Sequence, residues 1–121
     1  MKLTAEQARA AAEALSQVIA RDDPGITTGL RHGLRGVLRA LINVGAQDTE
    51  ASRLELIKKH GEPTEGGFQV EGEASVAFWE EYAPIAKEEC EVDASIALSD
   101  IGHLTLGPVV DAALEPLVVE D

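Results

Sequence analysis

The chain has few aromatic residues, a single cysteine and no long apolar run, and each of these shortages excludes a class of protein. Only 3% of its 121 residues are aromatic, and the lone Cys90 cannot form a disulfide within the chain. No apolar stretch approaches the roughly 20 residues that cross a bilayer, and the first residues lack the apolar core of a signal peptide. We therefore expect one domain, residues 1–121, in a reducing cytoplasm and without membrane contact.

Basic residues are also scarce, because 10 of them stand against 22 acidic ones and give a net charge of -12. This balance argues against direct nucleic-acid binding. The charge is unevenly distributed: residues 1–60 hold nine basic and seven acidic side chains, whereas residues 61–121 hold one and fifteen. The two parts are electrostatically opposite, and they can be satisfied within one fold, between subunits or by an outside ligand.

The first part predicts two helices. Thr4 and Gln7 form a capping box at the start of an alanine-rich, amphipathic segment over about 5–20. After a turn at 21–25, apolar periodicity predicts one long helix over 27–60, in which Gly45 permits a bend. We expect residues 1–61 to form an antiparallel helical hairpin.

The second part, residues 62–121, predicts an acidic half of mixed structure. Its expected elements are a short strand at 68–70, a third helix over 73–89 that Pro84 kinks or ends, an amphipathic strand at 90–99 and a short C-terminal helix over 108–115 that begins at Pro108. The predicted fold class is therefore α+β, mostly α.

Three arginines form the most specific pattern in the chain. Arg31, Arg35 and Arg39 follow an i, i+4, i+8 spacing with His32 beside the first, and no acidic residue occurs from 26 to 47. Such a stripe can bind phosphate or carboxylate groups of an anionic small molecule. The alternative is that the arginines pair with acidic residues of the C-terminal half.

Gly29, Gly33 and Gly36 lie on the same predicted helix and each lowers its stability by roughly 1 kcal/mol relative to alanine. Either a ligand or a second copy approaches the backbone there, or the glycines let the first helix pack closely. With the broad apolar seam, they predict a homodimer or higher oligomer.

Trp79 and Tyr82 lie with Phe78 on the third predicted helix, and they can anchor a protein interface or simply fill the core.

Catalytic patterns are weak throughout the sequence. Cys90 lies on the apolar side of its predicted strand and reads as a buried thiol. Asp93, Asp100 and His103 match no metal-ligand spacing, and no phosphate loop or serine elbow occurs. We expect no enzyme activity, no cofactor and no metal.

Several segments together resemble an uncharacterised family of small acidic proteins from tailed phages, both siphophages and prophages. They are the opening Lys2–Thr4, the block Arg53–Gly61, the strand Glu91–Asp93, and the endings Leu104–Leu106 and Leu114–Leu117. The resemblance implies a phage protein in the cytoplasm of a bacterial host. The expected function is stoichiometric inhibition of a host process such as anti-phage defence, through an anionic nucleotide-like ligand or a basic host protein. The alternative is an accessory or minor structural role in virion or tail assembly.

Overall fold

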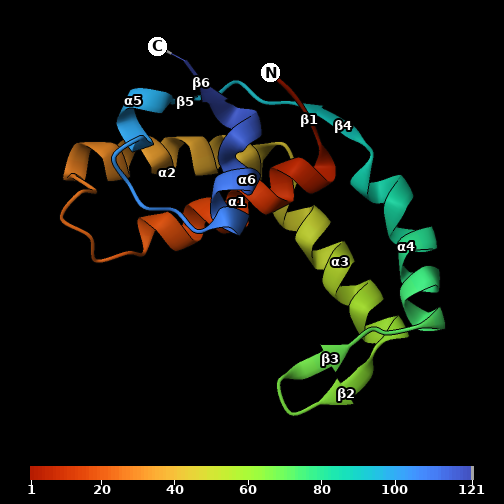
Figure 1. Cartoon of the computed structure of the whole chain (residues 1–121). Coiled ribbons are helices and arrows are strands. Elements are labelled where there is room, and N and C mark those ends of the chain that lie inside the picture. The colour runs from red at the N-terminus through yellow and green to blue at the C-terminus, as the bar shows by residue number, and fades with distance from the viewer. Residues whose placement is uncertain (121) are drawn as a thin grey trace.

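The computed structural model describes residues 1–120, and Figure 1 shows how its elements are arranged. The helices are α1 (Ala5–Ile19), α2 (Thr28–Asn43), α3 (Ala46–His60), α4 (Glu73–Ala86), α5 (Leu98–Ile101) and α6 (Pro108–Leu114), and the 3₁₀ turn η1 (Glu115–Leu117) follows α6. The short strands are β1 (Lys2–Thr4), β2 (Glu62–Thr64), β3 (Gly67–Gln69), β4 (Glu89–Glu91), β5 (Ile96–Ala97) and β6 (Val118–Val119). The predicted α+β, mostly α class is confirmed.

Helix α1 begins as the sequence predicts. The backbone N–H of Gln7 donates to Thr4 Oγ1 over 3.1 Å, and the backbone N–H of Thr4 donates to Gln7 Oε1 over 2.9 Å. This capping box satisfies two of the backbone donors that a helix start leaves unpaired. Ala8, Ala11, Ala14, Leu15 and Val18 of α1 are buried, so α1 lies at the centre of the main core.

The predicted long helix over 27–60 is wrong. The chain breaks between α2 and α3 at Gly45, whose φ of 101° lies in the left-handed region that glycine adopts without a steric cost. The break gives α3 a direction of its own, so that α3 leads away from α2 instead of extending it (Figure 1). Both α2 and α3 pack against α1.

The predicted strand over 90–99 is also wrong, because its two ends pair with different partners. Strand β4 pairs antiparallel with β1, which places Leu3 opposite Cys90. Strand β5 pairs in parallel with β6, which places Ile96 opposite Val118. Residues Leu98–Ile101 form α5. The alternating pattern predicted that Leu98 is buried, but its side chain is 45% exposed.

The remaining predicted elements are found with shifted bounds. The strand expected at 68–70 is β3, and it forms a hairpin with β2, which the sequence did not indicate. The third helix ends at residue 86, one turn before the predicted end, with Pro84 inside its last turn. The final helix begins at Pro108, as expected.

Two apolar cores divide the molecule. The main core gathers α1, α2, β1 and the elements from β4 to β6. A second core lies between α3 and α4, where Phe78, Tyr82 and Ala86 are buried against Leu56 and Ile57. Residues 46–86, which we call the arm, project from the main core with the β2–β3 hairpin at their tip (Figure 1). Each core therefore contains residues from both sides of residue 61, where the sequence had placed the boundary between the helical hairpin and the acidic half.

No helix within residues 1–120 combines the length and the apolar character that a membrane crossing requires.

Candidate binding surfaces

Arg31 serves the fold rather than an open binding surface. Its guanidinium donates hydrogen bonds to the backbone carbonyls of Ile19 and Arg21, the second over 3.1 Å. These carbonyls lie at the end of α1, where a helix leaves unpaired acceptors and a partial negative charge. Arg31 therefore fastens the start of α2 to the end of α1. The two helices run antiparallel (Figure 1).

Arg35 and Arg39 remain exposed, as does His32 between them and the start of α2. Within residues 1–120, neither arginine makes an ion pair, so the alternative of pairing with the acidic C-terminal half is not found in this part of the chain. The structure does not bring the three arginines into one cradle, because Arg31 is already bound. What remains is a ridge of two exposed cations along the outer side of α2.

The three glycines of α2 are not sites of close packing. A Cβ atom on Gly33 or Gly36 would meet nothing within 4 Å, and one on Gly29 would touch only Thr27 at 4.0 Å. The expectation that they let α1 approach closely is therefore wrong.

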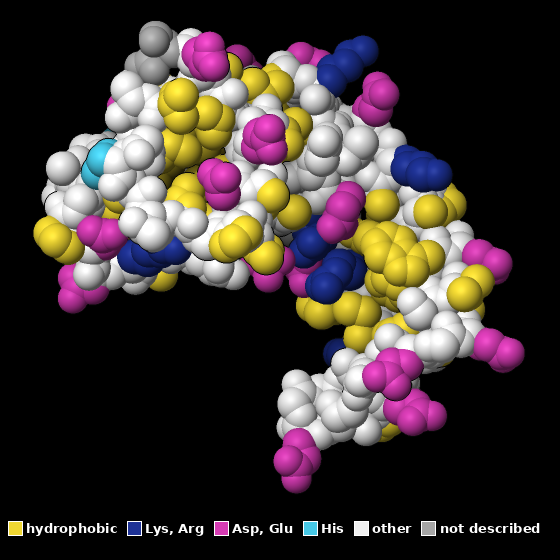
Figure 2. Space-filling view, in the orientation of Figure 1, with side chains coloured by type: hydrophobic (Ala, Val, Ile, Leu, Met, Phe, Trp, Pro, Cys, Tyr) yellow, Lys and Arg dark blue, Asp and Glu magenta, His cyan; other side chains and the backbone are white. Residues whose placement is uncertain are grey.

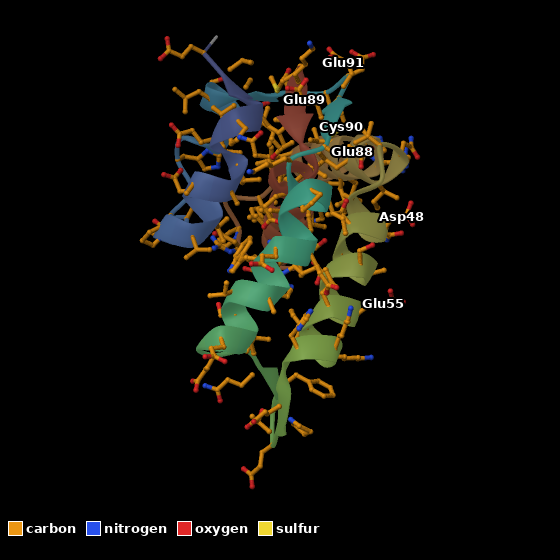
Figure 3. The ribbon with its side chains drawn as sticks, turned by 90° about the vertical axis from the view of Figure 1, so that its right-hand side faces the viewer. Asp48, Glu55, Glu88, Glu89, Cys90 and Glu91 are labelled. Atoms are coloured by element: carbon orange, nitrogen blue, oxygen red, sulfur yellow. The ribbon has the colours of Figure 1, made fainter. Side chains whose placement is uncertain are left out.

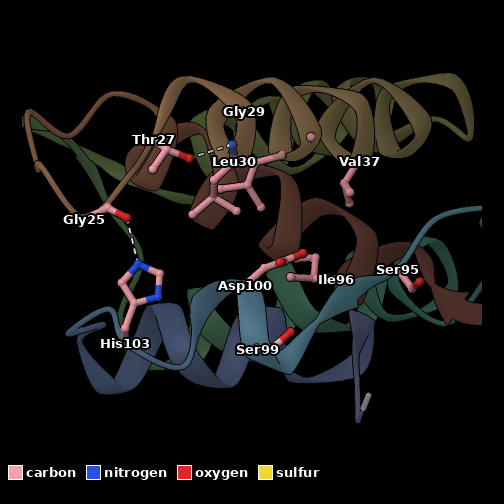
Figure 4. Close-up of a pocket in the computed structure, with 12 residues that line it drawn as sticks. Gly25, Thr27, Gly29, Leu30, Val37, Ser95, Ile96, Ser99, Asp100 and His103 are labelled. Carbon is pink, nitrogen blue, oxygen red and sulfur yellow. Dashed lines mark hydrogen bonds between the residues drawn. The ribbon is translucent and has the colours of Figure 1, made fainter.

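Two of these glycines instead line an open groove of about 420 Å³ between α2 and residues 95–103 (Figure 4). Gly29 and Gly33 form part of one wall, whereas Gly36 lies outside it. Asp100 and His103 stand on the opposite wall, and His103 Nε2 is 2.7 Å from the Gly25 carbonyl oxygen. The arginine ridge does not line this groove.

A second groove of about 580 Å³ runs between α1 and the α2–α3 connection, and we call it the seam groove. Its surface is predominantly apolar, and Leu38 and Ile42 of α2 face small residues of α1 across it. The groove is lined by Arg9, Ala12, Glu13, Ser16, Gln17, Ala20, Leu38, Ile42, Ala46, Gln47 and Glu50.

Arg9 is the centre of an ionic network that joins the arm to the main core. It is 8% exposed and binds Glu6 over 2.6 and 2.9 Å, and Glu13 and Glu50 over 3.0 Å each. Arg53 adds a 3.3 Å bond to Glu50. The network thus ties α1 to α3.

Tyr82 extends this network to α4. Its hydroxyl donates a hydrogen bond to the carboxylate of Glu6. Burial and this carboxylate raise the pKa of Tyr82 to about 12. Burial alone would raise the pKa of Glu6, but the hydrogen bonds from Arg9 and Tyr82 outweigh it and hold that pKa below its usual value. The ionised carboxylate is therefore the stable form at neutral pH.

The sequence carries a signal for part of this network that was not among the predictions above. Arg9 follows Glu6 by three residues and precedes Glu13 by four, which places both glutamates beside it on one helix surface. Their burial and the links to Glu50 and Tyr82 depend on contacts between distant segments.

The aromatic residues of α4 have separate roles. Phe78 is 7% and Tyr82 is 1% exposed, so both belong to the core between α3 and α4, whereas Trp79 is 52% exposed. The Trp79 ring lies 5.4 Å from Phe78 in an edge-on contact and 5.7 Å from Tyr82. Of the two residues predicted for an interface, only Trp79 presents its ring to solvent.

Apolar side chains gather on the arm, and acidic side chains lie on it and in the segment that follows it. Figure 2 shows apolar side chains over α3 and α4, and Val76, one turn before Trp79, is 61% exposed. Figure 3 shows Asp48 and Glu55 projecting from α3, and Glu88, Glu89 and Glu91 in the segment that follows α4. The arm therefore combines an exposed apolar flank with strongly acidic surroundings.

Cys90 is partly buried in β4, where its thiol lies 3.5 Å from the Leu3 carbonyl oxygen. Burial first, and then the charges of Glu88 and Glu91, raise the pKa of this thiol. A raised pKa disfavours the thiolate that nucleophilic chemistry requires. Among the described residues, no group of three or more His, Cys, Asp or Glu side chains has the geometry of a metal site.

The structure thus offers binding surfaces: an arginine ridge, two grooves and an arm with an exposed tryptophan. Comparison of this chain with protein-family models, with curated proteins and with solved structures gives no match.

Proposed function

We propose that this chain is a non-enzymatic phage protein that inhibits a host process, such as anti-phage defence, by binding a basic host protein stoichiometrically through its arm. The phage origin rests on the sequence resemblance. The choice of a protein partner rests on the surface of the arm, and chiefly on Trp79.

The exposed ring of Trp79 is the observation that carries this proposal. Its neighbours Phe78 and Tyr82 are buried, and their rings contact the Trp79 ring from one side and support its position. A rigid aromatic side chain loses little conformational entropy on binding, and tryptophan is strongly enriched among the residues that dominate interface energies. Val76 extends the same flank.

The charge of the chain indicates what kind of partner fits this flank. Glu73 and Glu80 of α4 are exposed, and the net charge of -12 creates a long-range negative field. Such a field accelerates encounter with a basic protein and disfavours an acidic one. Host proteins that bind nucleic acid present lysine and arginine to phosphates, so they are the class of partner that this surface fits best.

Capture of an anionic small molecule by the arginine stripe has less support. Arg31 is bound to the end of α1, and Arg35 and Arg39 line neither of the two large grooves. A small anion on this convex ridge would stay largely in water, where ion pairs contribute little.

Site-specific photocrosslinking during infection tests the proposal. A benzophenone amino acid at position 76 is expected to capture a basic host protein, and the Trp79→Ala change should abolish the product. The same probe at Val109, which is 83% exposed on α6, serves as the control position. The purified partner should then lose its nucleic-acid binding when one equivalent of the wild-type protein is added.

Two outcomes would overturn this proposal. Capture of a virion or tail protein at position 76 would favour the assembly role instead. Equal capture at positions 76 and 109 would show that the arm has no selective partner.

A further inference from the structure

The seam groove leaves apolar surface exposed that the fold itself does not cover. Leu38 and Ile42 of α2 are only partly buried, and they face Ala12, Ser16 and Ala20 across the groove. The residues from α1 are small, so the groove is wide enough for side chains from another molecule.

Charges of both signs lie in and near this groove. Its lining holds Glu13 and Glu50 with Arg9, which pairs with both, and the side chain of Glu13 is 60% exposed. Arg35 precedes Leu38 by three residues, and Arg39 precedes Ile42 by three, so both arginines lie one helical turn from the apolar side chains. Neither of these two arginines makes an ion pair within residues 1–120.

A surface with an apolar centre and borders of opposite sign is complementary to itself under a two-fold rotation. We infer that the seam groove is the interface of a two-fold homodimer, in which Arg35 and Arg39 of each copy meet the Glu13 border of the other. The Leu38 and Ile42 side chains of the two copies would then fill each other's grooves.

The charge distribution favours a second copy at this place over any other. Residues 1–60 carry nine basic and seven acidic side chains, whereas residues 61–121 carry one and fifteen. Two copies that meet through α1 and α2 therefore join their least negative parts and keep the strongly acidic parts apart. This inference places the interface in the seam groove instead of on the Gly29–Gly36 stripe that the sequence indicated.

The dimer goes beyond the proposed function, because it involves neither Trp79 nor the acidic flank of α4. It has a functional consequence all the same. Two arms on one assembly would bind two sites of a host protein, and the second contact would be favoured by the high effective concentration that the first creates.

Charge reversal across the groove tests the inference by analytical ultracentrifugation at physiological salt. The wild type is expected at twice the 12.8 kDa mass of the chain. The R35E/R39E variant should be monomeric, because its new glutamates face Glu13 of the other copy. The E13R variant should also be monomeric, because its new arginine faces Arg35 and Arg39.

Mixing the two variants provides the decisive measurement. In a mixed pair, glutamates 35 and 39 of one chain face arginine 13 of the other, and Glu13 of the first faces the native Arg35 and Arg39 of the second. Both borders are then complementary, so the mixture should regain the dimer mass. This recovery also shows that both variants are folded.

The control is K58E/K87E, which changes the net charge as much as R35E/R39E does. Lys58 and Lys87 are exposed and make no ion pair within residues 1–120. This variant should remain dimeric, and W79A should too, so that loss of the host partner and loss of the dimer can be told apart. A monomeric wild type at high micromolar concentration, or a mixture that stays monomeric, would overturn the inference.

Discussion

Replacement of Arg9 by methionine tests the ionic network that holds the arm. Methionine keeps much of the apolar stem of arginine, so the change removes mainly the guanidinium and its bonds to three glutamates. We expect the free energy of unfolding to fall by about 2–3 kcal/mol at neutral pH.

The magnitude follows from the burial of the partners. Removal of one member of a fully buried ion pair costs about 3–5 kcal/mol, because the other charge stays buried without a partner. Arg9 is nearly buried, but the side chains of Glu6 and Glu50 are 33% and 37% exposed, and Glu13 is 60% exposed. Water can hydrate these partly exposed carboxylates once the guanidinium is removed. The expected loss in the free energy of unfolding is therefore smaller than for a fully buried ion pair.

The loss should depend on pH in one direction. The folded-state pKa of Glu6 is lowered, so its contribution to stability is present above the unfolded pKa of about 4.3 and is lost as the pH falls through the folded value. The stability difference between the wild type and Arg9→Met should therefore be largest near neutral pH and should shrink below about pH 4.

Urea denaturation followed by circular dichroism measures these differences. The control is Arg53→Met, which removes one 3.3 Å bond to Glu50 and should cost less than about 1 kcal/mol. An Arg9→Met loss as small as that of the control would refute the network as the main tie between α1 and the arm. A loss that persists unchanged in acid would assign the effect to packing of the stem.

Three further predictions follow from individual positions. In thermal melts, Gly33→Ala and Gly36→Ala should each raise the free energy of unfolding by up to about 1 kcal/mol, since their Cβ atoms enter open space. Gly45→Ala should lower it by about 1–2 kcal/mol, because the φ of Gly45 is 101°. Equal effects at all three positions would contradict both expectations. The pKa of Tyr82 is raised to about 12, so its contribution to stability is present below about pH 10 and is lost as the pH rises to 12. Tyr82→Phe should therefore reduce the fall in the free energy of unfolding at alkaline pH. An unchanged fall would argue against the hydrogen bond from Tyr82 to Glu6 of α1. Burial and nearby carboxylates raise the pKa of the Cys90 thiol, so a thiol reagent should label it slowly in the native protein and quickly in urea. Fast labelling of the native protein would contradict this and would indicate a reactive thiolate.

Sequence alone determined the elements whose signals are local. The capping box of Thr4 and Gln7 fixes the start of α1, and Pro108 fixes the start of α6. Both signals act within one helical turn, so they need no knowledge of the remaining fold. Apolar periodicity likewise located most of the helical sequence, although it merged α2 with α3 and missed α5, and it gave the correct fold class.

A local pattern does not determine bounds and breaks where it fits two structures. Gly45 is compatible with a bent helix and with a break, and the choice depends on whether α3 gains more by following α2 or by packing against α4. Residues 90–99 alternate like one strand, but the partners β1 and β6 come from opposite ends of the chain and divide it. Periodicity carries no information on which distant strand is available.

The roles of the candidate site residues were decided by tertiary structure. Arg31, Arg35 and Arg39 share one spacing, yet the end of α1 lies within reach of Arg31 only. Trp79 and Tyr82 are both aromatic residues of α4, yet α3 and Glu6 bury the second and leave the first exposed. The sequence specifies which side chains a helix carries, but burial and charge pairing depend on which distant segments pack against each of its sides.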